Sequence, residues 1–226
     1  MDHEEKTALV TGASTGLGFE AAAQLAEEGF GRVIVTARTP AKGGATVERL
    51  VARTGMDVFE AITLDNDVLS TVDTAADELA PMGGIDLLIL NAGIAPPAKL
   101  RRTVDDLDAV VSSSLVGHHR LTVRLLERGQ VNENARIVIA GSEAARGDVP
   151  MMHPADINDF AAEHFDGDLE AAIETQMRMT SPARYKGNDV YATTKLFAAW
   201  WAAELATRLP KGATVNAVSP GATPDT

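Results

Sequence analysis

The stretch Thr11-Gly-Ala-Ser-Thr-Gly-Leu-Gly18 follows a short apolar run, Thr7–Val10, and precedes a helix-like run from Phe19 to Glu28. A strand that enters a glycine-rich turn and leaves it as a helix is the arrangement that cradles a dinucleotide pyrophosphate. The helix N-terminus offers the anion unpaired N–H groups and the positive end of the helix dipole. The stretch therefore predicts a dinucleotide-binding turn, with an ordinary strand–helix turn as the alternative.

The three glycines of this turn have separate expected roles. Gly12 permits the tight turn, Gly16 lets the backbone approach phosphate closely, and Gly18 lets helix and strand pack together. The cofactor contacts predicted for the turn are Gly12, Ser14, Thr15, Gly16, Leu17 and Gly18.

Composition bounds the class of protein. With 226 residues, 45% of them hydrophobic, the chain is long enough for one α/β domain with a substantial core. The net charge of −12 argues against a nucleic-acid partner. The absence of cysteine excludes disulfides, zinc thiolates and a cysteine nucleophile, and the five histidines show no metal-ligand spacing, so no metal is expected. No long apolar run is present, which favours a cytoplasmic protein without a membrane span.

Short apolar runs alternate along the chain with longer helix-like segments. Strands are predicted at residues 7–10, 32–36, 58–64, 85–90, 136–140 and 214–218, and helices at about 17–28, 40–54, 67–80, 104–128 and 189–208. Because the strands are nearly continuous in Val, Ile and Leu, this alternation predicts a parallel sheet buried on both faces. The expected fold class is α/β, a Rossmann-type doubly wound sheet in three layers, forming a single domain over residues 1–226.

Three motifs in order along the chain carry a family resemblance. The spacing T-G-x-x-x-G-x-G, then Asn91-Ala-Gly93 after an apolar strand, then Tyr191-Ala-Thr-Thr-Lys195, resembles the short-chain dehydrogenase/reductase family. The resemblance implies the strand order 3-2-1-4-5-6. It also implies that Asn91 pins the carboxyl edge of the sheet through side-chain hydrogen bonds and that Gly93 leaves room for the adenosine ribose, with Ala92 between them in the cofactor site. A plain strand-terminating turn is the alternative for Asn91-Ala-Gly93.

The end of the second predicted strand bears on the choice of cofactor. An NAD enzyme usually carries Asp or Glu about 20 residues past the third glycine, for the ribose 2′-hydroxyl. Arg38 stands there, no acidic residue lies between Arg32 and Pro40, and a guanidinium suits a 2′-phosphate. NADP (NADPH) is therefore expected over NAD, with Lys42 assisting. Thr15 departs from relatives that carry a second basic residue there, and a solvated arginine at a strand end is the alternative.

Asp65 and Asn66 follow the third predicted strand. Asp65 could cap the next helix, or it could accept a hydrogen bond from the adenine amino group as its family counterpart does. Asn66 lies inside the same turn. Both residues are predicted cofactor contacts.

Tyr191 and Lys195 stand near the start of a long predicted helix, and their i, i+4 spacing places both side chains on one face. A phenol has a pKa near 10, and a lysine cation nearby in a site shielded from water favours the phenolate. Tyr191 then becomes a usable general acid or base near neutral pH, and Lys195 could also bond the nicotinamide ribose. Ser142, at the carboxyl end of a buried strand, matches the family serine that bonds the substrate carbonyl, with a simple cap as the alternative.

The segment Ser112-Ser-Ser-Leu-Val-Gly117 departs from the family pattern V-N-x-x-G. Ser114 takes the place of an Asn that in relatives holds a water connecting the active-site lysine to solvent. Ser114 is kept as a candidate catalytic residue, although its side chain has a shorter reach and can bond back to its own helix. His118 and His119, beside it, are expected on the helix surface or at an interface.

Residues 146–187 are a predicted helical insertion near the substrate cleft. They resemble the insertions of mammalian-type carbonyl reductases and light-dependent protochlorophyllide reductases. Such an insertion can cover the substrate and block the helix face used for tetramer formation, which favours a monomer or homodimer. Its methionines suit an adaptable apolar pocket or, equally, ordinary core packing: Met151, Met152, Met177 and Met179.

Pro220-Gly221 matches the family motif in which the backbone lies beside the nicotinamide carboxamide, and Thr223 or Thr226 could bond that carboxamide. Relatives continue into a substrate-covering helix pair and a seventh strand. A C-terminal substrate region and a seventh strand are therefore expected to be absent from residues 1–226.

Together these residues predict an NADP-dependent oxidoreductase that transfers hydride between C4 of nicotinamide and a small-molecule carbonyl or secondary alcohol. In the reducing direction Ser142 and Tyr191 bind the substrate oxygen, Tyr191 donates the proton, and Lys195 lowers the pKa of Tyr191. The alternative is a nucleotide-binding sensor or scaffold without turnover. Ser114 and the expected absence of the C-terminal region favour that alternative, and the intact Ser142, Tyr191 and Lys195 oppose it.

Overall fold

The computed structural model describes residues 3–221. Its centre is a six-stranded sheet in the order β3-β2-β1-β4-β5-β6, with every neighbouring pair parallel, which confirms the expected order. The strands are β1 Thr7–Val10, β2 Arg32–Ala37, β3 Phe59–Thr63, β4 Ile85–Leu90, β5 Val131–Ala140 and β6 Thr214–Val218.

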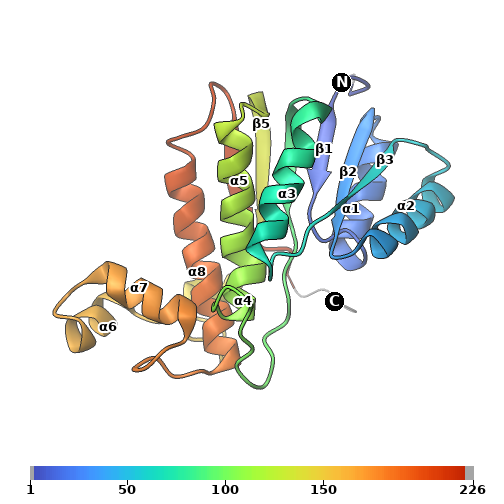
Figure 1. The fold of residues 1–226 in the computed structure, drawn as a ribbon. Coiled ribbons are helices and arrows are strands. Elements are labelled where there is room, and N and C mark those ends of the chain that lie inside the picture. Colours follow the sequence, from blue (N-terminus) through green and yellow to red (C-terminus); the bar gives the residue numbers. More distant parts are fainter. Residues whose placement is uncertain (1–2, 222–226) are drawn as a thin grey trace.

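Helices cover the sheet from two sides, which gives the three layers seen in Figure 1. One side carries α1 and α2, and the other carries α3, α5 and α8. The helices are α1 Gly16–Glu27, α2 Pro40–Thr54, α3 Leu69–Leu79, η1 Ala80–Met82, α4 Ala109–Val111, η2 Ser112–Val116, α5 Gly117–Glu127, η3 Glu143–Arg146, α6 Ile157–His164, α7 Leu169–Arg178 and α8 Gly187–Leu205.

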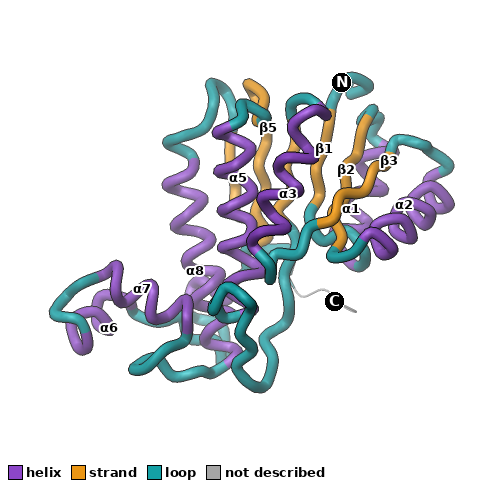
Figure 2. The backbone as a smooth tube through the Cα atoms, in the orientation of Figure 1, coloured by secondary structure: helices purple, strands orange, loops and turns teal. Residues whose placement is uncertain are grey.

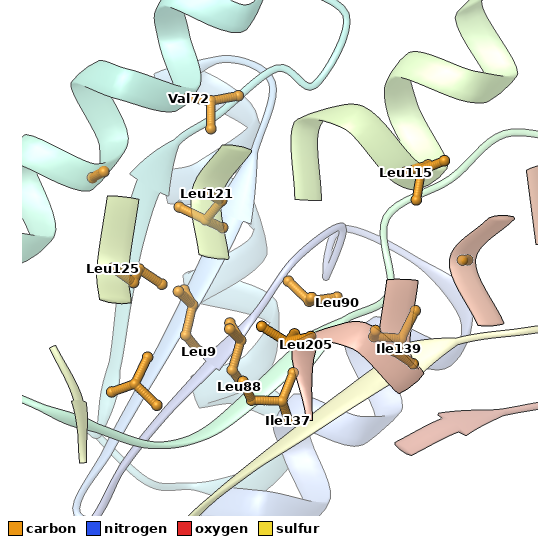
Figure 3. Packing of buried hydrophobic residues seen from close by; sticks show 14 of the residues in the cluster. Leu9, Val72, Leu88, Leu90, Leu115, Leu121, Leu125, Ile137, Ile139 and Leu205 are labelled. Carbon is orange, nitrogen blue, oxygen red and sulfur yellow. The ribbon is translucent and has the colours of Figure 1, made fainter. Parts of the chain in front are cut away.

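The core divides along the alternation of each strand, because successive side chains point to opposite faces of a sheet. Leu9, Ile34, Leu88 and Ile137 lie in register across four strands and pack in the larger cluster, under α3, α5 and α8. Figure 3 shows part of this cluster, with Leu121 and Leu125 of α5 facing the strands. Neighbouring residues such as Val10 and Val35 pack in the second cluster, under α1 and α2.

The predicted elements and the observed ones agree closely. The strands at 7–10, 85–90 and 214–218 and the helix at 40–54 have the predicted bounds. The helix predicted from residue 104 begins only at Ala109, because Asp108 caps it: Oδ1 of Asp108 accepts from the N–H groups of Val110 and Val111 at 2.8 and 3.2 Å. No described helix has the length and apolarity that crossing a bilayer requires.

The helix between Ala109 and Glu127 changes its winding partway. Its α-helical turn α4 passes into the π-helical segment η2 and then into α5. A π-helical turn holds one residue more than an α-helical turn and is frequent at functional sites. Hydrogen bonds to the loop after β3 accompany the change: Ser112 Oγ donates to the Asn66 carbonyl at 2.7 Å, and Asn66 Nδ2 donates to the Ser113 carbonyl at 2.9 Å.

Residues 146–187 contain the two short helices α6 and α7, which lie beyond the carboxyl ends of the strands (Figures 1 and 2). This segment is tied to the loop after β4. Tyr185 Oη donates to the Pro97 carbonyl at 2.7 Å, and the Asp108 N–H donates to the Met177 carbonyl at 3.1 Å. The segment and that loop therefore stand together at the edge of the sheet where α/β proteins bind ligands.

Candidate active site

The glycine-rich turn has the close contacts that its sequence predicts. Gly12 and Gly16 have positive φ angles of 66° and 59°, which favour glycine. A Cβ on Gly12 would lie 2.7 Å from Ala92 Cα, and a Cβ on Gly18 would lie 2.6 Å from the Gly12 carbonyl oxygen and 2.5 Å from Asn91 Nδ2. The turn is therefore packed directly against the loop that follows β4.

The N-terminus of α1 is open to a ligand. Its N-cap residue, Thr15, makes no side-chain capping bond, and the first turn holds no acidic residue. The first N–H groups of a helix have no partner inside that helix. Gly16 and Leu17, both exposed residues, thus stand at the positive end of the helix dipole, where the first N–H groups can serve as donors.

Asn91 and Thr11 join the turn to the end of β4. Asn91 Nδ2 donates to the Thr11 and Gly12 carbonyls at 3.1 and 3.3 Å, as the resemblance implied. Thr11 Oγ1 accepts from the backbone N–H groups of Asn91 and Ala92 at 2.9 and 3.0 Å. The sequence prediction gave Thr11 no role of its own, although it opens the quoted motif.

Arg38 is exposed at the end of β2 and makes no hydrogen bond or ion pair with residues 3–221. Thr15 and Lys42 are also exposed. A second guanidinium, which the sequence prediction missed, reaches the turn from α2: Arg49 Nη1 donates to the Ser14 carbonyl at 2.9 Å, and its Cζ lies 4.5 Å from the centroid of the Phe19 ring. Arg49 has no carboxylate partner among the described residues, so two positive charges border the turn.

The loop after β3 corrects one expectation. Asp65 does not cap the next helix, because α3 begins at Leu69 with Val68 at the N-cap. Asp65 Oδ1 instead accepts from the Asp67 N–H at 3.1 Å, and the cap-like bond to the Leu69 N–H comes from Asp105 Oδ2 at 2.9 Å.

Asn66 packs against the helix that carries Ser114. It is buried, and a Cβ on Gly117 would lie 2.6 Å from its side chain. Gly117 is therefore required by close packing rather than by a turn.

Ser114 is buried at the inner side of η2. Its exposed fraction is 2%, and its hydroxyl has no hydrogen-bond partner in the described part of the chain. A Cβ on Gly93 would lie 3.0 Å from Ser114 Oγ, so the hydroxyl faces the loop that follows β4. An unpartnered hydroxyl in this position has the capacity to bind a water or ligand atom.

Lys195 is the buried cation of the site. It is 6% exposed, and Nζ donates to the Ala140 carbonyl at 2.6 Å, which ties α8 to the end of β5. Burial lowers the pKa of Lys195 to about 8. Nζ also lies 5.5 Å from the ring centroid of Tyr191, which is half-buried one helical turn earlier.

Ser142 lies two residues after the end of β5 and caps the short helix η3, which packs against α8. Its Oγ accepts from the Ala144 N–H at 3.2 Å. The cap that was the alternative reading of Ser142 is therefore present, and it leaves the hydroxyl proton free for another acceptor. The three candidate catalytic residues come from two places near the carboxyl end of β5. Ser142 caps η3 just after the strand, and Tyr191 and Lys195 lie on α8, which Lys195 ties to Ala140.

His118 does not lie on the helix surface, contrary to the sequence expectation. It is 1% exposed, and its Nε2 lies 2.9 Å from Thr11 Oγ1. The sequence gave no sign of this contact, because Thr11 lies 107 positions earlier in the chain. His119 is exposed and stacks edge-on against Trp201, with ring centroids 5.6 Å apart.

An apolar cluster adjoins Tyr191. Met179 is buried in it, and Met177, Tyr185 and Tyr191 pack around it. These two methionines thus take part in ordinary packing beside the candidate site, whereas Met151 is 76% exposed.

Of the remaining predicted contacts, Pro220 and Gly221 lie exposed after β6, and Thr223 and Thr226 lie outside the described residues.

The fold and this edge define a nucleotide-binding α/β protein with a buried lysine beside a tyrosine. A family model for short chain dehydrogenase matches residues 6–154. The chain is 27% identical over 222 residues to short chain dehydrogenase sol3 of Alternaria solani, covering 96% of this chain and 71% of that one. It is 31% identical over 219 residues to retinol dehydrogenase 12 of Homo sapiens, covering 96% and 61%. This chain is thus shorter than both relatives.

A solved structure of a short chain dehydrogenase from Burkholderia cenocepacia in complex with NADP matches with a TM-score of 0.69 at 28% identity, covering 99% of this chain and 77% of that one. The chain belongs to the short-chain dehydrogenase/reductase family of oxidoreductases.

Proposed function

We propose that this protein binds NADP(H) and transfers hydride between the nicotinamide and a carbonyl or secondary alcohol, with Tyr191 as general acid and base. The observation that carries the proposal is the buried Lys195, held by the Ala140 carbonyl one helical turn from Tyr191. Burying an ammonium destabilises the fold, so its presence beside a phenol favours a role in proton chemistry.

The residues of the turn fit a dinucleotide. The uncapped N-terminus of α1 suits the pyrophosphate, and the space beside Gly12 and Gly18 admits no side chain. Arg38 and Arg49 suit a ribose 2′-phosphate because neither is neutralised by a carboxylate of the described residues. The NADP complex of the Burkholderia cenocepacia relative supports the same cofactor.

The remaining cofactor contacts are proposed from their positions at this edge. They are Ser14, Thr15, Gly16, Leu17, Asp65, Asn66, Asn91, Ala92, Gly93, Lys195, Pro220 and Gly221. Residues 146–187 are proposed to lie over the substrate, because Met177 and Met179 pack in the same apolar cluster as Tyr191. An apolar carbonyl compound suits such surroundings.

In the proposed reduction the bound cofactor supplies hydride to the carbonyl carbon. Ser142 and Tyr191 bind the carbonyl oxygen, and the Tyr191 hydroxyl releases its proton to that oxygen as negative charge develops there. The Lys195 ammonium stabilises the phenolate that remains. Ser114 is the proposed site of a water that returns a proton toward Lys195. Oxidation of an alcohol runs through the same groups in reverse.

The experiment measures NADPH and NADH binding by fluorescence titration, and NADPH oxidation with a panel of ketones, aldehydes and quinones. Arg38→Ala is expected to weaken NADPH at least tenfold and to leave NADH within about twofold, since an Arg–phosphate contact is worth about 1.5–3 kcal/mol. Arg53→Ala is the matched control, because Arg53 pairs with Glu20 and Glu27 instead.

Tyr191→Phe tests the proton step separately. It is expected to retain NADPH affinity and to lose at least a hundredfold in kcat, the usual contribution of a general acid. NADPH bound tightly with no turnover of any compound would favour a sensor over an enzyme. Equal affinity for NADH and NADPH would refute the role of Arg38.

A further inference from the structure

Thr11 Oγ1 lies where four polar groups meet. It accepts from the N–H groups of Asn91 and Ala92, at 2.9 and 3.0 Å, and lies 2.9 Å from His118 Nε2 and 3.3 Å from the Ile89 carbonyl oxygen. A hydroxyl group has two lone pairs and one proton. The two backbone N–H groups occupy both lone pairs, so the hydroxyl proton has two acceptors within reach, the Ile89 carbonyl at 3.3 Å and His118 Nε2 at 2.9 Å, and we infer that it goes to the nearer Nε2.

His118 is suited to receive this proton. Burial, followed by the positive charge of Lys195, lowers the pKa of His118 to about 3, while the Ser114 carbonyl acts weakly in the opposite direction. The imidazole is therefore neutral at physiological pH and has one donor and one acceptor nitrogen. With Thr11 as donor to Nε2, the imidazole proton is on Nδ1, which is buried and has no hydrogen-bond partner among the described residues.

We propose that His118 is a positioning residue of the cofactor site: as the Nδ1–H tautomer, it accepts the Thr11 hydroxyl proton and so fixes the lone pairs that hold Asn91 and Ala92. The part of this proposal that concerns cofactor affinity rests on the proposed function.

The effect of the hydrogen bond reaches the glycine-rich turn through Ala92. The Gly12 backbone has no room for a methyl group against Ala92 Cα, and Asn91 bonds the Thr11 and Gly12 carbonyls. The hydroxyl of Thr11 thus sets how the turn and the loop after β4 meet. Without an acceptor at residue 118, the nearest alternative for its proton is the Ile89 carbonyl at 3.3 Å, which requires the hydroxyl to rotate and turn its lone pairs away.

The same contact anchors the helix that carries Ser114. His118 follows Ser114 by four positions, across the junction between η2 and α5. Because His118 is neutral, the buried Lys195 ammonium has no second buried positive charge beside it to repel it. His118 therefore acts through Thr11 and Lys195, without a step of its own in the reaction.

Four variants test the proposal by NADPH titration. His118→Leu removes the acceptor, and Thr11→Val removes the hydroxyl at similar volume. Each is expected to weaken NADPH binding about tenfold, the equivalent of about 1.4 kcal/mol. The double variant is expected to bind no more weakly than the worse single variant, because both remove one shared interaction. His118→Gln, whose side-chain oxygen can reach the position of Nε2, is expected to stay within about threefold of wild type.

A second measurement needs no cofactor and no variant that folds poorly. Long-range proton–nitrogen NMR correlations of the wild-type protein identify the tautomer of each histidine. The buried histidine that does not titrate near neutral pH is expected to carry its proton on Nδ1. A proton on Nε2, strictly additive losses in the double variant, or failure of His118→Gln to restore binding would each overturn the proposal. A wild-type protein that binds neither nucleotide would instead overturn the proposed function, and the NMR result would still decide the tautomer.

Discussion

Replacing Lys195 with methionine is expected to stabilise the protein while it abolishes the proposed activity. Lys195 is 6% exposed, and burial lowers its pKa from the ordinary 10.5 to about 8. The folded state therefore holds the proton less tightly than the unfolded state does. At about 1.4 kcal/mol per pKa unit, keeping the ammonium charged inside the fold costs about 3 kcal/mol at pH 7.

The substitution also removes a hydrogen bond. The Ala140 carbonyl, 2.6 Å from Nζ, loses its side-chain partner, which costs about 1 kcal/mol. The net expectation at pH 7 is that Lys195→Met unfolds with a free energy about 2 kcal/mol higher than wild type. For a chain of this size that corresponds to a melting temperature roughly 4–8 °C higher.

The pH dependence distinguishes this reasoning from a packing effect. Because the folded pKa lies below the unfolded one, the destabilisation is complete below about pH 8 and disappears as the pH rises through 10.5. The difference in free energy of unfolding between Lys195→Met and wild type should therefore shrink over that pH window and change sign above it. Above pH 10.5 wild type should be the more stable protein, by about 1 kcal/mol. Urea unfolding followed by circular dichroism at a series of pH values measures this difference in the free energy of unfolding.

Lys211→Met is the matched control, since Lys211 is exposed and its substitution should give no pH-dependent gap. Both Lys195 proteins are compared in a Tyr191→Phe background, because Lys195 lies beside Tyr191, and groups distant from residue 195 then cancel in the difference. A Lys195→Met protein that is less stable than wild type at pH 7, with a gap that stays constant toward pH 10.5, would refute the argument.

Two further substitutions test the packing of the cofactor turn and the pairing of the helices. Gly18→Ala is expected to destabilise the fold by about 1–3 kcal/mol and to weaken NADPH binding, because the added methyl group meets the Gly12 carbonyl and Asn91. Gly44→Ala is the control, since Gly44 lies on α2 with open space around it. Thermal unfolding should show the Gly44→Ala protein to be slightly more stable than wild type. Asp73 bonds Arg120 at 2.5 Å and Arg124 at 3.0 Å, and the Arg120 hydrogen bond contributes most to lowering its pKa to about 2. Asp73→Asn should therefore unfold about 1 kcal/mol more easily at pH 7, a figure reduced for solvent screening. This loss should fade as the pH falls through 3.8 toward 2, and a loss that persists there in urea unfolding contradicts the ion-pair assignment.

The sheet and its order could be predicted because each strand is a short apolar run that tolerates few other conformations. The bounds of β1, β4 and β6 match residue for residue. The roles of the glycines in the turn could also be predicted, since each lies where a Cβ would meet backbone atoms or where φ is positive. At these positions the local backbone conformation and the packing of the whole fold both require glycine.

The parts that the sequence did not reveal depend on contacts between distant segments. Arg49 reaches Ser14 only because α2 packs beside α1, and nothing local distinguishes Arg49 from Arg53, the other arginine of α2. His118 was expected on the helix surface or at an interface because its partner Thr11 lies 107 positions earlier in the chain, and the π-helical turn Ser112–Val116 before it was not foreseen. The run of three serines is the one local signal that this helix departs from regularity, since serine competes for backbone hydrogen bonds. The capping alternative for Asp65 stayed open because Asp105, which bonds the Leu69 N–H, is remote in sequence.

The π-helical turn Ser112–Val116 also constrains how this sequence can change in length. It holds one residue more than a regular turn, so a deletion of a single serine could close it into an α-helix without breaking the chain. Such a deletion would leave the segments before and after the turn facing as they do now, because a π-helical turn accommodates its extra residue within the same rotation as an α-helical turn. The Asp108 cap and the contact of His118 with Thr11 would keep their places, and only the bonds between the serines and Asn66 would change. A deletion in the regular part of α5 would instead rotate the two sides of the helix by about 100° relative to each other, so this helix should tolerate the loss of one residue at Ser112–Val116 better than elsewhere.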